Sequence, residues 1–88
     1  MPVKKYTVKI KPRAVRELKC LPENVQRRVI AALEKLENGL SGDVKRLTNY
    51  TPEYRVRVGE YRVLFEVEKD SVVVYRISLR RDAYRRQG

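Results

Sequence analysis

The chain has 88 residues and a formal net charge of +10 at pH 7, from 21 Lys and Arg against 11 Asp and Glu. This length suits one small domain over residues 1–88, and the charge favours nucleic acid, an acidic protein or an anionic membrane as partner. The chain has no histidine, which excludes Ser-His and Cys-His nucleophiles, and its single cysteine leaves too few of the usual ligands for a zinc site. We therefore expect neither a metal nor a small-molecule cofactor.

The cellular compartment is suggested by what the sequence lacks. No apolar run approaches the ~18 residues of a membrane span, so a membrane partner is not expected. The N-terminal Met-Pro-Val-Lys-Lys-Tyr has no apolar stretch of the kind found in secretory signals. A lone Cys20 cannot form an intramolecular disulfide. These features predict a cytoplasmic protein. Cys20 itself lies where a helix should pack, so we expect it to be a small core residue.

The first half of the chain predicts one strand and two helices. Residues 5–10 alternate between polar and apolar side chains, which is the period of a strand. Pro12 suits the first turn of a helix, and helical spacing continues to Pro22, which ends that helix and starts the next. The second helix ends at Asn38-Gly39. Its apolar stripe consists of Val25, Val29, Leu33 and Leu36. The two helices form a helical hairpin.

The second half of the chain predicts three strands after a connector. The connector covers residues 40–52, and the strands cover 54–58, 61–68 and 72–79, with a short basic tail from residue 81. The order β-α-α-β-β-β predicts an α+β fold, with the N-terminal helical hairpin packed on one face of a small antiparallel sheet. The face that the helices cover is expected to carry Tyr54, Val56, Val58, Val63, Phe65 and Val67.

The turn at Gly59-Glu60 predicts the register of a β-hairpin. With these two residues as the loop, Val58 pairs with Tyr61, and Arg57 lies opposite Arg62. Side chains directly opposite each other are about 5 Å apart at Cβ, and like charges there are destabilising. We therefore expect an anion to bind between Arg57 and Arg62.

Taken in order, these segments resemble the RelE/ParE superfamily of bacterial and archaeal toxins, and within it the RelE branch. The resemblance covers essentially the whole chain and includes the first strand and the helical hairpin from Pro12 to Asn38. It continues through Lys45-Arg46-Leu47, Tyr-Arg-Val-Arg-Val at 54–58, Gly-Glu-Tyr-Arg-Val-Leu-Phe-Glu-Val at 59–67 and Arg-Arg-Asp-Ala-Tyr-Arg at 80–85.

The resemblance implies a function. RelE-type toxins of type II toxin–antitoxin systems are ribosome-dependent endoribonucleases without a metal. They cut mRNA in the ribosomal A site through attack of a ribose 2′-OH on the neighbouring phosphate. A cognate antitoxin wraps the toxin and inactivates it. The partners implied for this chain are therefore the ribosome, mRNA and an acidic, RelB-like antitoxin.

The resemblance also implies roles for individual residues. Residues expected to bind RNA phosphates are Arg55 and Arg57 on the second predicted strand, with Lys45 and Arg46 before it. Residues expected to act in catalysis are Arg62, which follows the hairpin tyrosine, Arg80 or Arg81, which match the late arginine, and Tyr84 near the C-terminus. In the family that tyrosine stacks on the reacting nucleotide or takes a proton from it.

The chain departs from the family at the second predicted strand. Well-studied RelE members have lysines there, one of them proposed as a proton acceptor, whereas this chain has Arg55 and Arg57. A guanidinium has a pKa above ~12 and stays protonated, so these side chains can hold phosphate but are poor bases. Tyr84 is then the best candidate base, since nearby positive charge lowers a phenol pKa from its reference near ~10.

Other interpretations remain open at this point. Arg55, Arg57 and Arg62 are also compatible with an ordinary solvated surface, partly compensated by Glu66, and Tyr84 with a packing role. The whole chain is also compatible with a ParE-like inhibitor of DNA gyrase, which shares the scaffold without the full arginine and tyrosine set. A third possibility is a non-catalytic module that binds RNA or the ribosome.

Overall fold

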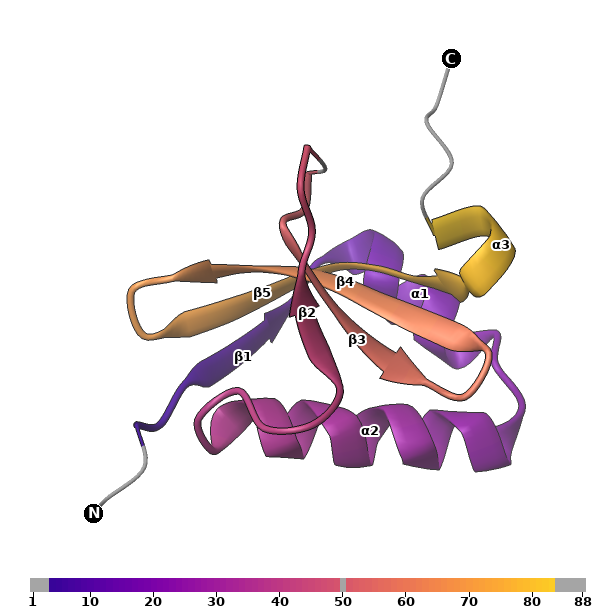
Figure 1. Cartoon of the computed structure of the whole chain (residues 1–88). Coiled ribbons are helices and arrows are strands. Elements are labelled where there is room, and N and C mark those ends of the chain that lie inside the picture. The colour runs from indigo at the N-terminus through magenta and orange to yellow at the C-terminus, as the bar shows by residue number, and fades with distance from the viewer. Residues whose placement is uncertain (1–3, 50, 84–88) are drawn as a thin grey trace.

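The computed structural model describes residues 4–49 and 51–83 (Figure 1). The elements in this part of the chain are β1 (Thr7–Ile10), α1 (Pro12–Lys19), α2 (Glu23–Glu37), β2 (Val44–Arg46), β3 (Tyr54–Val58), β4 (Tyr61–Glu68), β5 (Ser71–Leu79) and α3 (Arg80–Ala83). The helical hairpin and the last three strands lie where periodicity predicts them, which confirms the α+β class. None of the helices described is long and apolar enough to cross a bilayer.

The sheet differs from the prediction in two respects. Its strand order is β1-β5-β4-β3-β2, and β1 pairs with β5 in parallel, so the sheet is mixed and not wholly antiparallel. β2 lies inside the segment predicted as a connector and pairs antiparallel with β3. Three residues are too few to show a period of two, and the direction of β1 depends on how the chain returns after α2. Neither feature has a local signal in the sequence.

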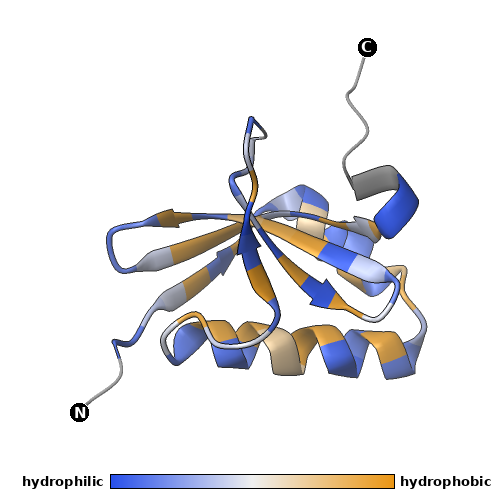
Figure 2. Ribbon diagram, in the orientation of Figure 1, coloured by the Kyte–Doolittle hydropathy of each residue, from blue (hydrophilic) through white to orange (hydrophobic). Residues whose placement is uncertain are grey.

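The core lies between α2 and one face of the sheet. α2 buries Val29, Leu33 and Leu36 against this face, where Val56 and Phe65 are also buried. The ring of Tyr54 stacks on Phe65 with centroids 5.5 Å apart. Figure 2 shows hydrophobic and hydrophilic residues alternating along β3, as expected for a strand with one covered face. The prediction of this apolar face is confirmed.

α1 lies against β5, beyond the point where β1 ends. The carboxylate of Glu17 accepts a hydrogen bond from the backbone N–H of Ile77 at 2.7 Å and another from Nε of Arg76 at 3.1 Å. This side chain satisfies a backbone donor on β5 past the end of its pairing with β1. The core position predicted for Cys20 is wrong, because this residue caps the C-terminus of α1 and is exposed.

The β3–β4 hairpin has the predicted register. Val58 pairs with Tyr61, and Arg57 lies opposite Arg62. Gly59 has a φ of +59°, and a Cβ on it would lie 3.1 Å from the guanidinium nitrogens of Arg28 on α2. Glycine suits this position for two reasons: it adopts the positive φ without strain, and it has no Cβ to crowd Arg28.

Candidate functional site

The hairpin places the predicted arginines on the face of the sheet opposite to the core. Alternation along each strand puts cross-strand neighbours in rows on this outer face. One row runs from Arg57 through Arg62 to Ser78, which pairs with Arg62. The next row consists of Lys45, Arg55, Leu64 and Arg76. Cations from four strands are therefore brought together on one face, and only Arg57 and Arg62 among them are neighbours through a local turn.

A cleft of about 920 Å³ opens at the hairpin end of this face. Its lining residues are Arg57, Gly59, Glu60, Arg62, Leu79, Arg80 and Arg81. The late arginines reach the hairpin because the backbone N–H of Arg80 donates to the carbonyl of Glu60 at 2.8 Å. Four arginines from β3, β4 and α3 thus share a cleft in which Glu60 is the carboxylate among the described lining residues.

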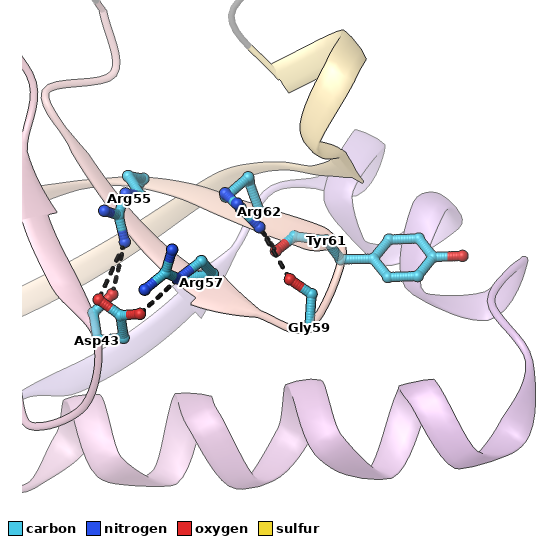
Figure 3. Close-up of polar contacts among 6 residues, drawn as sticks. All are labelled: Asp43, Arg55, Arg57, Gly59, Tyr61 and Arg62. Carbon is cyan, nitrogen blue, oxygen red and sulfur yellow. Dashed lines mark hydrogen bonds and ion pairs between the residues drawn. The ribbon is translucent and has the colours of Figure 1, made fainter.

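Arg62 is fixed in this cleft by the hairpin itself. Its side chain is 5% exposed, and its Nη1 donates to the carbonyls of Gly59 at 3.0 Å and Tyr61 at 2.9 Å (Figure 3). These hydrogen bonds give a buried charge polar partners, as burial of a guanidinium requires. One terminal nitrogen is used, while the rest of the guanidinium can donate into the cleft. Arg62 is therefore a rigid donor and not a free surface charge.

Arg57 and Arg55 share one carboxylate, that of Asp43. Nε of Arg57 lies 2.6 Å from Oδ2 of Asp43, and Nη1 of Arg55 lies 3.3 Å from Oδ1 and 2.9 Å from the Asp43 carbonyl (Figure 3). The hydrogen bond from Arg57, followed by that from Arg55, holds the pKa of the Asp43 carboxyl below its usual range. The carboxylate that neutralises Arg57 is therefore that of Asp43, and not that of Glu66 as the solvated-surface interpretation supposed.

Asp43 reaches these arginines because the ladder between β2 and β3 continues one residue before β2. The backbone N–H of Arg57 donates to the Asp43 carbonyl at 3.1 Å, so Asp43 lies opposite Arg57. In the sequence, Ser41-Gly42-Asp43 resembles a turn, and only the register of β2 reveals the pairing. This is the site residue that sequence reasoning missed.

Glu66 does not compensate the arginines. One of its carboxylate oxygens accepts a hydrogen bond from the backbone N–H of Glu53 at 3.1 Å. Glu53 precedes β3, at the end of this strand opposite to the Gly59-Glu60 turn. Burial raises the pKa of its carboxyl.

Of the other predicted site residues, Lys45 and Arg46 lie outside the cleft lining, Arg81 belongs to it, and Tyr84 is not among the described residues. Arg46 forms an ion pair with Glu53 at 3.2 Å and lines a separate hollow of the loop that follows β2. Lys45 is exposed and pairs with Arg55 across the sheet, beside the cleft and not in its lining. Arg81 is exposed at the cleft, whereas Tyr84 lies outside the described residues.

Comparison with known proteins assigns the chain to a family. A family model described as the ParE toxin of type II toxin–antitoxin systems, parDE, matches residues 8–84. The chain belongs to this toxin family. Toxin RelE3 of Methanocaldococcus jannaschii is 32% identical to it over 75 residues, which are 80% of this chain and 85% of the relative. The RelE/ParE resemblance inferred from sequence is thereby confirmed.

Solved structures of RelE complexes have the same fold as the toxin. The RelB-RelE antitoxin-toxin complex from Methanococcus jannaschii matches with a TM-score of 0.72 and 29% identity, covering 86% of this chain and 94% of that one. The archaeal RelE-RelB complex from Pyrococcus horikoshii OT3 matches with a TM-score of 0.74 and 29% identity, covering 90% and 99%. The toxin therefore has a RelE-like fold over most of its length.

Proposed function

We propose that this toxin is an endoribonuclease that cuts mRNA in the ribosomal A site. The observation that carries the proposal is the arginine-lined cleft, in which Arg57, Arg62, Arg80 and Arg81 converge from three elements. A phosphodiester that passes through a pentacoordinate transition state gains negative charge. Fixed cations around such a group stabilise the transition state more than the ground state.

In this proposal the lining arginines have two different roles, phosphate binding and stabilisation of transition-state charge. Arg57 and Arg62 hold the scissile phosphate, because both lie on paired strands and at least one nitrogen of each is already fixed. Arg80 and Arg81, at the start of α3, offset the charge that develops in the transition state. Attack of the 2′-OH forms a bond from its oxygen to phosphorus and breaks the bond to the leaving 5′-oxygen, which takes up a proton.

The arginines do not accept the 2′-OH proton, because a guanidinium remains protonated. Tyr84 is the acceptor that the family resemblance implies, and Glu60 is the carboxylate that lines the described cleft. Comparison of Tyr84→Phe with Glu60→Gln distinguishes them, since only loss of the true acceptor lowers the rate of cleavage. The alignment of mRNA by the ribosome then supplies much of the catalysis through positioning.

The toxin is also proposed to bind an acidic, RelB-like antitoxin. Two of the similar solved structures are complexes of a RelE protein with RelB. A net charge of +10 favours rapid association with an acidic chain.

Primer extension on mRNA during translation tests the nuclease proposal. The unaltered toxin should produce cuts within codons, and the Arg80→Ala, Arg81→Ala double variant should cut about 100- to 1,000-fold more slowly. The matched control is Arg27→Ala, which removes an exposed, ion-paired arginine of α2 that is not among the lining residues. Wild-type rates in the double variant would reject the assignment of these residues.

The matching family is described as a ParE toxin, so the ParE-like alternative, inhibition of DNA gyrase by protein contact, is the second candidate. ParE-like toxins of that kind require no cleft for a scissile phosphate. A supercoiling assay with purified gyrase, run beside the primer-extension assay, separates the candidates. Inhibition of gyrase with intact mRNA would replace the nuclease proposal. Salt-sensitive RNA binding without either effect would instead indicate a non-catalytic module.

A further inference from the structure

Asp43 is a carboxylate at a site that should bind an anion. It contacts Arg57 through Oδ2 at 2.6 Å and Arg55 through Oδ1 at 3.3 Å, and its own backbone carbonyl accepts a second hydrogen bond from Arg55 at 2.9 Å. Its side chain is 47% exposed, whereas that of Arg55 is 13% exposed. A carboxylate here weakens the attraction of the site for phosphate, so its presence needs a compensating benefit.

The geometry of the hydrogen bonds identifies that benefit. A guanidinium has five N–H donors in one plane, and Arg57 uses its Nε–H on Asp43. Within residues 4–49 and 51–83, neither of its terminal nitrogens has a hydrogen-bond partner, so both can donate elsewhere. Arg55 uses Nη1 and keeps its Nε–H and its other terminal nitrogen. Asp43 therefore holds each guanidinium by one side and leaves the other side available to a phosphate.

Asp43 is itself held by the backbone. Its carbonyl accepts from the N–H of Arg57 at 3.1 Å, which continues the β2–β3 ladder. The preceding Gly42 has a φ of +111°, a backbone conformation that residues with a side chain rarely adopt. Glycine at this position therefore lets the backbone turn into the β2–β3 ladder just before Asp43. Because its backbone is held at the sheet edge, Asp43 restricts the rotamers of Arg55 and Arg57 through its hydrogen bonds. Part of the conformational entropy of these two side chains is therefore lost before RNA binds.

We propose that Asp43 is a positioning residue for RNA cleavage, an inference that rests on the proposed nuclease function. It orients Arg55 and Arg57 so that their free N–H donors meet the phosphates of the bound message. Its negative charge lowers the affinity for RNA, while its hydrogen bonds raise the rate of the chemical step. This combination distinguishes positioning from simple competition, in which the carboxylate would only occupy the place of a phosphate.

The test uses Asp43→Ala and Asp43→Asn, with Asp70→Ala as the matched control. Asp70 is an exposed aspartate that pairs with Lys4 at 3.3 Å in the β4–β5 turn, so its removal deletes the same charge away from the cleft. In single-turnover cleavage of mRNA on ribosomes, Asp43→Ala should lower the maximal rate about 10- to 100-fold. The toxin concentration that gives the half-maximal rate should stay unchanged or fall, because removal of the Asp43 carboxylate removes a negative charge that repels RNA.

Two further measurements do not depend on cleavage. In NMR spectra, the Nε–H signal of Arg57 should be sharp in the unaltered toxin and should broaden or shift to solvent-like values in Asp43→Ala. Asp43→Asn should retain part of that signal, because an amide oxygen still accepts. In fluorescence anisotropy with a single-stranded RNA oligonucleotide, both variants should bind as tightly as the unaltered toxin or several-fold more tightly.

The results that overturn the inference differ from those that overturn the proposed function. If the unaltered toxin cuts mRNA and Asp43→Ala cuts as fast or faster, Asp43 does not position the arginines. If the unaltered toxin does not cut mRNA, the nuclease proposal fails. The inference is then judged by the Arg57 signal, and a signal that survives in Asp43→Ala refutes it. Thermal melts of both alanine variants establish that the fold is retained.

Discussion

Arg62 combines a structural and a proposed functional role in one side chain, and this affects how its substitution is interpreted. Its guanidinium is buried and donates to two hairpin carbonyls. Arg62→Ala should therefore lower the free energy of unfolding by about 2–3 kcal/mol, since two charge-assisted hydrogen bonds and a buried stem are lost. Arg80→Ala, at an exposed position, should change it by no more than about 0.5 kcal/mol.

Urea denaturation of the two variants checks this difference. Equal stabilities would show that the hairpin does not depend on Arg62. The practical consequence is that loss of mRNA cleavage in Arg62→Ala does not by itself demonstrate a catalytic role. Arg80→Ala and Arg81→Ala give a cleaner test of the cleft, because both arginines are exposed.

The pH dependence of the Asp43 contacts follows from their effect on its pKa. The hydrogen bonds from Arg57 and Arg55 lower the pKa of this carboxyl in the folded protein. The folded state therefore binds fewer protons than the unfolded state between the two pKa values, and stability rises with pH there. We expect the contribution to be complete above about pH 4 and to be lost as the pH falls through the folded pKa.

A carboxyl ¹³C titration of the folded toxin measures this pKa directly. Its midpoint should lie below the usual aspartate range and should rise in Arg57→Gln, which removes the main hydrogen bond. An identical midpoint in the two proteins would show that Arg57 does not contact Asp43 in solution.

Among the elements, α1 makes its side-chain hydrogen bonds to β5 through Glu17. Glu17 accepts from the backbone N–H of Ile77 and from Nε of Arg76, both part-buried contacts. Glu17→Ala should lower the free energy of unfolding by about 2–3 kcal/mol, because a backbone donor loses its partner. Glu17→Gln should cost less, since its amide oxygen still accepts one bond.

Hydrogen exchange gives the local measurement for this contact. The amide of Ile77 should exchange faster in Glu17→Ala, while urea denaturation gives the loss of stability. Glu34→Ala, at an exposed position of α2, is the control and should leave both unchanged. Unaltered exchange at Ile77 in Glu17→Ala would mean that another group satisfies this amide.

At the scale of the whole molecule, the charge of +10 predicts strongly salt-dependent RNA binding. If three or four arginines of the cleft contact phosphates, the slope of log K against log salt concentration should be about −2 to −3 for single-stranded RNA. Each cleft arginine replaced by glutamine should reduce the slope by about 0.7, and Arg27→Gln should not change it. Anisotropy titrations at several salt concentrations measure these slopes. If the slope of log K against log salt concentration is the same in the cleft variants as in the unaltered toxin, the RNA binds elsewhere on the surface.

Much of this toxin follows from local patterns in its sequence. Helical spacing from Pro12 to Asn38, alternation in the last three strands and a two-residue turn at Gly59-Glu60 each act over a few neighbouring residues. Because such constraints are short in range, they determined the helical hairpin, the last three strands, the covered face of the sheet and the opposition of Arg57 and Arg62.

The tertiary structure decided what depends on contacts distant in sequence. The parallel pairing of β1 with β5, the pairing of β2 with β3 and the placement of Arg80 on the hairpin turn all join segments with no shared local signal. Asp43 illustrates the reason most directly, since its carboxylate meets Arg57 only because a strand of three residues aligns one particular register. The sequence alone determined that Arg57 and Arg62 lie opposite each other on one face, and the fold determined that Arg57 is already held by a carboxylate.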